Sequence, residues 1–232
     1  MSFLVKNDLY SAIKVDELEV LIEDSPNGEA DLEATIAAVM AEIGSYIGHR
    51  YDTALAFIDV KVYATGDEYN TDEVIVLIAD NWQALEYGTG DLVSRNGKIW
   101  NATGDTETTD EPGVAAVWAE AGDAKAFYKS LDDTNIELPV DGLAWEKIAD
   151  PRNPLLFRMA VDMSLYELYA RINPRQIPEH RVKKHDDAVD YLKRAADPRK
   201  NVTIEGLELV DHGSKSGTDI TWNSNEKISH SW

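Results

Sequence analysis

Apolar residues recur with the period of an α-helix near both ends of this 232-residue chain, but not between them. A spacing of four and three residues predicts one apolar stripe on a helix over 31–47, made of Leu32, Ile36, Val39, Ile43 and Tyr46. Such a stripe has to be buried against another element. Because the other long helical patterns begin only after residue 153, we expect the two ends of the chain to close into one helical bundle.

A helix is predicted to start at Pro154, because Asn153 is a good N-cap and proline suits the first helical position. Asn173 and Pro174 are expected to end this helix. It has too many apolar residues for one stripe, which indicates burial on more than one side: Leu155, Leu156, Phe157, Met159, Met163, Tyr166 and Leu168.

Three other helices are predicted from weaker signals. The longest covers 178–196, and its outward face is expected to be basic because it carries Arg181, Lys183, Lys184, Lys193 and Arg194. Its inward face is expected to hold Val182, His185, Val189, Leu192 and Ala196. Near the N-terminus, we expect two short helices over 8–13 and 17–22, with Asn7 and Asp16 as their N-caps.

The middle of the chain, residues 59–150, has the sequence pattern of strands and turns rather than of helices. Residues 59–64 alternate between apolar and polar, and residues 74–79 form a continuous apolar run, so both predict strands. The glycines and tryptophans that follow are typical of turn-rich β structure. A Glu-Gly turn predicts a further hairpin over 202–209. We therefore expect an α+β fold with three parts: a bundle of about four helices from 1–58 and 151–210, an inserted β-rich domain at 59–150, and a C-terminal arm at 211–232.

Charge is distributed unevenly along the chain. The formal net charge is −21; residues 1–150 hold 31 acidic and 9 basic residues, whereas residues 151–232 hold 12 acidic and 13 basic ones. An acidic surface repels duplex DNA, because DNA binding depends on Lys and Arg contacts to phosphate. Such a surface suits a conduit along which DNA moves without sticking. The alternative is that the acidity serves solubility alone.

Few chemistries are open to this chain. It contains no cysteine, which excludes disulfides, thiolate metal ligands and cysteine nucleophiles. His180 and His185 lie five residues apart rather than the four of a helical zinc pair, and no nucleophile-elbow, P-loop or dinucleotide motif occurs. No signal peptide and no apolar run of membrane-spanning length is visible. We therefore expect a protein that is not an enzyme, has no cofactor and no metal, and does not contact a membrane.

Two parts of the chain have sequence patterns that resemble those of a known protein family. Residues 3–9 precede a helix that ends in Ile43, Tyr46, Ile47, Arg50 and Tyr51, while 151–170 and 180–192 supply two later helices. These segments resemble the I-x-x-Y-I/L-x-x-R-Y, P-x-x-L-x-x-x-x-x-D-x-x-x-Y-x-L and R-Y-x-x-A-I-x-W-L patterns of tailed-phage head–tail adaptors, also called connector or head-completion proteins. The resemblance covers about 1–58 and 151–210; the insert at 59–150 departs from the short members of the family.

The resemblance implies a structural virion protein that forms a ring, expected to have twelve copies, below the portal protein. The ring would extend the DNA channel, let DNA pass without specific binding, and join the capsid to the next neck or tail protein. Its location would be the virion neck, after assembly in the host cytoplasm. We expect partner docking by the basic helix face and the arm, through Arg181, Lys184, Arg194, Trp222 and Trp232. The alternatives are a solvated helix face and an arm without a docking role.

Within the insert, Tyr87, Gly90-Asp91, Val93, Gly97 and Trp100, followed by a proline and Trp118, resemble small chitin- or cellulose-type carbohydrate-binding modules. The resemblance implies a tight hairpin closed at Gly97 and a small core reached by Val93 and Ile99. Trp100, Trp118 and Tyr87 would then stack on sugar rings. The chain would in that case be a carbohydrate-binding protein displayed on a helical holder. The alternative is that these aromatic residues form the core of a scaffolding or decorating module.

Overall fold

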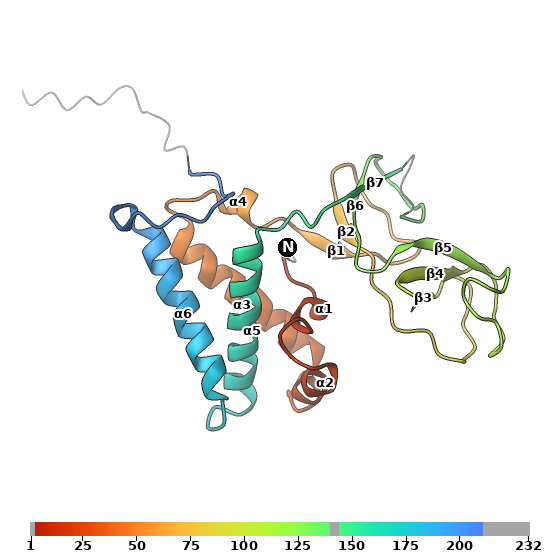
Figure 1. The fold of residues 1–232 in the computed structure, drawn as a ribbon, viewed down its shortest axis with the longest axis horizontal. Helices are drawn as coiled ribbons and strands as arrows, with labels where there is room; N and C mark the ends of the chain where they lie inside the picture. Colours follow the sequence, from red (N-terminus) through yellow and green to blue (C-terminus); the bar gives the residue numbers. More distant parts are fainter. Residues whose placement is uncertain (1–2, 140–143, 211–232) are drawn as a thin grey trace, which may run out of the picture.

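The computed structural model describes residues 3–139 and 144–210. Helices occupy one side of the molecule and two small β-sheets occupy the other, as Figure 1 shows. The α+β class expected from the sequence is confirmed. The chain passes from the helical side into the β region after residue 58 and returns to it before residue 154.

Three long helices form the body of the helical side: α3 (Glu29–Ile47), α5 (Pro154–Ile172) and α6 (Glu179–Ala196). Each of the three packs against the other two. Shorter elements complete this side: α1 (Lys6–Leu9), α2 (Val15–Glu23), α4 (Thr53–Ala56) and the 3-10 helix η1 (Pro198–Lys200). Within the described residues, no helix has the length and apolarity needed to cross a membrane.

The ends of α5 follow from its sequence. The Asn153 side chain accepts hydrogen bonds from the backbone N–H groups of Leu155 and Leu156, Pro154 is the first helical residue, and the helix stops before Asn173. Buried residues lie on several sides of α5, as expected from its composition. Of the apolar residues named for this helix, Leu155 is 37% exposed, and Phe157 and Tyr166 are half-buried.

The two short N-terminal helices begin earlier than predicted. The N-cap of α1 is Val5 rather than Asn7, because the Asp8 carboxylate accepts the Val5 backbone N–H at 2.8 Å. The N-cap of α2 is Lys14, so Asp16 lies inside the first turn. An acidic residue there still interacts favourably with the positive end of the helix dipole, but it does not mark the boundary.

The β region contains two sheets. One has the order β1-β2-β6-β7, in which β1 (Val60–Val62) runs parallel to β2 (Val74–Val76) and the pairs with β6 (Phe127–Ser130) and β7 (Trp145–Ile148) are antiparallel. The other is the antiparallel meander β3 (Leu92–Arg95), β4 (Lys98–Ala102) and β5 (Trp118–Asp123). Asn96 and Gly97 both have positive φ between β3 and β4, which is the tight two-residue hairpin predicted at Gly97.

The hairpin predicted over 202–209 is wrong. A turn does form at Glu205 and Gly206, but the two flanking segments do not pair with each other. Their backbone groups are bonded to the helical side instead: Ile204 N–H donates to the Tyr51 hydroxyl, and Leu209 forms an isolated bridge with Tyr51. These contacts hold the segment against the end of the bundle and bury Ile204. A hairpin that extended away from the bundle would leave Ile204 exposed.

Candidate functional site

The residues that carry the head–tail adaptor resemblance lie inside the helical side and join distant parts of the chain. Ile43, Ile47 and Tyr51 are buried. The Arg50 guanidinium donates to the carbonyl oxygens of Ala195, at 2.6 Å, and Val202, at 2.8 Å. A cation at the C-terminal end of a helix interacts favourably with the dipole of that helix, here α6. The end of α3 therefore holds the end of α6.

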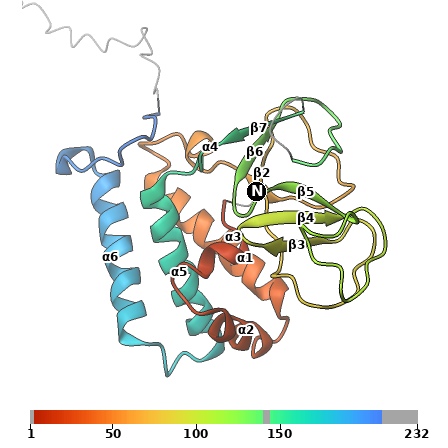
Figure 2. The same ribbon diagram turned by 45° about the vertical axis from the view of Figure 1, so that its right-hand side comes forward.

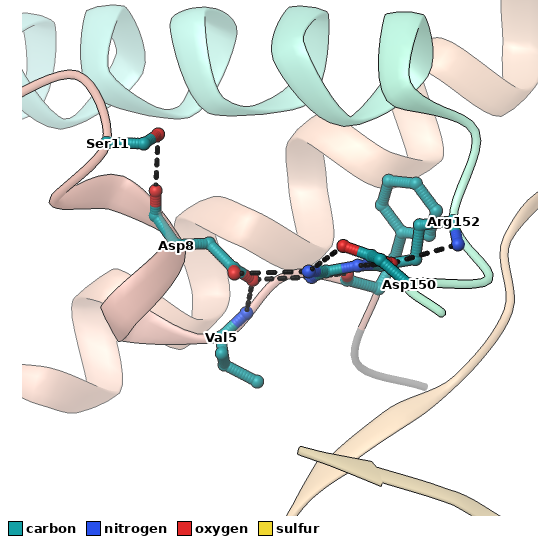
Figure 3. Close-up of polar contacts among 6 residues, drawn as sticks. Val5, Asp8, Ser11, Asp150 and Arg152 are labelled. Atoms are coloured by element: carbon teal, nitrogen blue, oxygen red, sulfur yellow. Dashed lines mark hydrogen bonds and ion pairs between the residues drawn. The ribbon is translucent and has the colours of Figure 1, made fainter. Parts of the chain in front are cut away.

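A second junction is centred on Arg152, at the point where the chain returns from the β region to α5 (Figure 3). Its guanidinium forms ion pairs with Asp8 at 2.6 Å and Asp150 at 2.8 Å, and it donates to the Phe3 carbonyl oxygen. Burial alone would lower the pKa of Arg152, but the hydrogen bonds that its guanidinium donates to Asp150 and Asp8 outweigh this effect and leave the pKa above its ordinary value. Arg152 thus ties the N-terminal segment to the start of α5.

The prediction that Arg181 points outward and docks a partner is wrong, because Arg181 is buried. Only 4% of Arg181 is exposed, and its guanidinium donates to the Ala12 carbonyl oxygen at 2.6 Å. The reason is the buried Asp162 of α5, which lies 3.8 Å from Arg181 and 2.8 Å from Lys184. Arg181 and Lys184 therefore neutralise a carboxylate within the bundle, and Arg181 is closed to a partner.

The outward face of α6 carries mixed charge rather than the basic character predicted for it. Arg194 is exposed, as predicted, but it pairs with Asp190 one turn earlier. Lys183 and Lys193 are exposed together with Asp186 and Asp187. Because Asp186, Asp187 and Asp190 lie on the same helix surface, its positive charge is weaker than the basic residues alone suggest. Two further predicted docking residues, Trp222 and Trp232, lie outside the described residues.

The aromatic residues predicted to stack on sugars are largely used for packing. Trp118 is 6% exposed, and its indole N–H donates to the Asp110 carbonyl oxygen at 3.0 Å. The Tyr87 ring meets Trp118 edge-on at 5.6 Å between centroids. Trp100 is half-buried, and a side chain at Gly113 would come within 3.0 Å of its ring. Trp118 is therefore a core residue of the β3–β5 module, and one side of Trp100 is covered.

Val93 and Ile99 are both buried, as the resemblance implied, but they belong to different cores. Val93 packs with Trp118 on one face of the meander, while Ile99 faces the four-stranded sheet and its buried Trp145. An aromatic contact that sequence reasoning missed lies beside them: the Arg95 guanidinium stacks over the Trp82 ring at 4.8 Å. The meander is thus packed on both faces, which limits the surface open to a ligand.

A cluster that could hold a metal ion lies between the three long helices. Glu42 of α3, Glu167 of α5 and His185 of α6 place one potential ligand atom each within 4.8 Å of one another. All three residues are half-buried. Sequence reasoning did not find the cluster, because it is made only when three separated helices pack. The available signal was His185, a titratable residue on the predicted inward face of its helix.

Comparison of the chain with protein families, with curated proteins and with solved structures finds no match. The resemblance to head–tail adaptors therefore depends on the residues named above. Arg50, Tyr51 and Asp162, which belong to the resembling patterns, all make contacts between separated parts of the helical side.

Proposed function

We propose that this chain is a structural protein of a tailed-phage virion, a head–tail adaptor that forms a ring below the portal protein. The observation that supports this proposal most is the single core built from both ends of the chain, residues 3–56 and 156–204. The segments that carry the resemblance are the ones that meet in this core. Arg50, Tyr51 and Arg152 bond across it between positions about 150 residues apart.

The arrangement of the parts suits a ring of identical copies. The helix α6 and the β region lie on opposite sides of the molecule in both views (Figures 1 and 2). Residues 151–200 hold 11 basic and 7 acidic residues, whereas residues 1–150 are strongly acidic. A contact between unlike surfaces of neighbouring copies generates a closed ring when the rotation closes. Although the face of α6 carries mixed charge, its exposed Lys183 and the exposed Lys200 of η1 favour a contact with the acidic N-terminal helices of the next copy.

The acidic character supports passage of DNA rather than its capture. The exposed residues Asp16, Glu17, Glu23 and Asp24 on and after α2 add to a chain with a net charge of −21. Duplex DNA binds proteins through counterion release at Lys and Arg contacts, which such a surface does not provide. In the proposed ring, the genome moves through the lumen without specific contacts, and the chain catalyses no reaction.

The alternative function, carbohydrate binding by the β region, has less support. Of its three predicted contact residues, Trp118 is buried and Tyr87 packs against it, so Trp100 is the residue left to contact a sugar. A chitin pull-down with the full chain and with Trp100→Ala tests this alternative. Binding of the full chain to chitin, lost in Trp100→Ala, would support a glycan role. Equal results for the two proteins would indicate that the aromatic residues only form a core.

Assembly with the portal protein of the same phage tests the proposed function. We expect electron microscopy and native mass measurement to show rings in which the two proteins have equal copy number. The double variant Lys183→Glu and Lys200→Glu, at two exposed positions, should reduce ring formation while the circular dichroism stays unchanged. Arg175→Glu, exposed in the loop between α5 and α6, is the matched control and should assemble normally. Failure of the unmodified chain to join the portal would contradict the proposal.

A further inference from the structure

The cluster of Glu42, Glu167 and His185 joins the three helices that make up the body of the helical side. One residue comes from each of α3, α5 and α6, and these helices pack against one another in pairs. The three potential ligand atoms lie within 4.8 Å of one another. A group bound at this point would connect all three helices at once.

The His185 ring is held in place from two directions. It stacks on the Tyr166 ring, with centroids 4.1 Å apart and an angle of 27° between the planes. Its Nδ1 atom lies 3.2 Å from a carboxylate oxygen of Asp186. When Nδ1 carries the proton and donates to this carboxylate, Nε2 has the free lone pair. Metal-binding histidines are commonly oriented by a carboxylate on the second ring nitrogen in this way.

Within residues 3–139 and 144–210, the two glutamates of the cluster have no paired Lys or Arg. Buried or partly buried carboxylates elsewhere on these helices are paired: Asp162 with Lys184, and Asp31 with Arg171. Among the described residues, neither Glu42 nor Glu167 forms an ion pair with Lys or Arg, and the Glu42 carboxylate accepts a 3.3 Å hydrogen bond from the Tyr46 hydroxyl. A divalent cation bound between the two carboxylates and the imidazole would interact favourably with both carboxylates.

We propose that Glu42, Glu167 and His185 bind one divalent transition-metal ion of the Zn²⁺ type. Two carboxylate oxygens and one imidazole nitrogen are a donor set that Zn²⁺ accepts, with water as the fourth ligand, whereas Ca²⁺ and Mg²⁺ prefer oxygen alone. Bonds of about 2.1 Å put tetrahedral ligands about 3.4 Å apart, so ligand atoms that now lie within 4.8 Å of one another would move closer by up to about 1.4 Å.

Space for the fourth ligand is present beside the glutamates. A cleft of about 420 Å³ between α3 and α5 is lined by both Glu42 and Glu167, and by the small residues Ala38 and Ala170. Water can therefore reach the ion from this side. Because the three ligands come together only in the folded chain, the ion binds the folded state and raises its stability. Its role is to pin α3, α5 and α6 together.

Titration of the full chain with ZnCl₂, followed by calorimetry, tests the site directly. We expect saturable binding of one ion per chain, and a melting temperature that rises with Zn²⁺ and falls again with EDTA. MgCl₂ at the same concentration should have little effect. His185→Gln and Glu167→Gln should each weaken Zn²⁺ binding at least tenfold. The matched control is His180→Gln, which changes an exposed histidine on the same helix and should bind like the unmodified chain.

The acidic surface supplies the competing explanation, since a chain of charge −21 attracts cations nonspecifically. Equal binding by His185→Gln, Glu167→Gln and His180→Gln would show that Zn²⁺ is held by that surface, and it would overturn the proposal. The absence of saturable one-to-one binding in the unmodified chain would do the same. The second result needs no variant, so the test remains decisive if a substitution prevents folding.

Discussion

The helical side and the β region are built in different ways. One core unites residues that are far apart in the sequence, since α3 and α5 are separated by the whole β region. The β region has three smaller cores that draw almost entirely on residues 58–148, with Val5 as a contribution from the N-terminal segment. The helical side therefore requires both ends of the chain, whereas the β region is closed mainly by contacts within itself. A module of that kind can be inserted without changing the core that carries it.

The largest expected effect comes from a charge inside the shared core. Met159 of α5 is 6% exposed, and Met159→Asp places a carboxylate there without a partner. We expect a loss of about 5 kcal/mol or more in the free energy of unfolding, because an unpaired buried charge is very unfavourable. The far-ultraviolet circular dichroism of the helices should be lost. A melting curve equal to that of the unmodified chain would contradict the single helical core built from both ends of the chain.

A somewhat smaller and more local effect is expected in the β region. Trp118→Ala removes a buried ring from the core shared with Val93 and Ala102, at an expected cost of about 4 kcal/mol. Because this core is separate from the helical one, the β3–β5 meander should open first while the helical signal at 222 nm persists. Hydrogen exchange of the two regions is the measurement. Simultaneous loss of protection in both would show that they unfold as one unit.

The junction between the regions can be tested at Arg152. Arg152→Met removes the cation that Asp8 and Asp150 share, and two carboxylates are left near a buried position. We expect a loss of about 3 kcal/mol, since breaking a buried ion pair leaves an uncompensated charge. Arg199→Ala is the matched control, because Arg199 is 90% exposed and pairs with Asp197 at the surface. Equal melting temperatures for the two variants would contradict the role assigned to Arg152.

The smallest predicted effect depends on pH. Asp31 accepts hydrogen bonds from Ser25 and Asn27 and pairs with Arg171, and these contacts lower its pKa below the ordinary value. A carboxyl with a lowered pKa stabilises the folded state above about pH 4, and that contribution is lost as the pH falls through the lowered value. The difference in melting temperature between the unmodified chain and Asp31→Asn should therefore shrink below about pH 4. A difference that stays constant down to about pH 2 would refute the assignment, and Asp24→Asn serves as the exposed control.

The long helices could be predicted from the sequence because their signals are local. Asn153 and Pro154 mark the start of α5, and the spacing from Leu32 to Tyr46 marks α3. The two-residue turn at Asn96 and Gly97 was equally local. The burial of Arg181 was missed because it depends on Asp162, a residue of another helix whose position is fixed only by packing.

The candidate sites were harder to predict for the same reason. Trp118 has the sequence spacing of a sugar-binding residue, but its burial depends on how the turn around Asp110 folds over it. Glu42, Glu167 and His185 show no spacing signal at all, since each lies on a different helix. Aromatic and charged residues show similar sequence patterns whether they pack in a core or bind a ligand. Their burial in the folded chain distinguishes the two roles.

The most direct test of the proposed function is the position of this chain in the particle. Antibody labelling of purified phage virions, imaged by electron microscopy, tests whether the protein lies at the neck as proposed. We predict label only at the junction of head and tail, with a copy number equal to that of the portal protein. Label spread over the capsid or tail, or virions that contain none of this protein, would contradict the account.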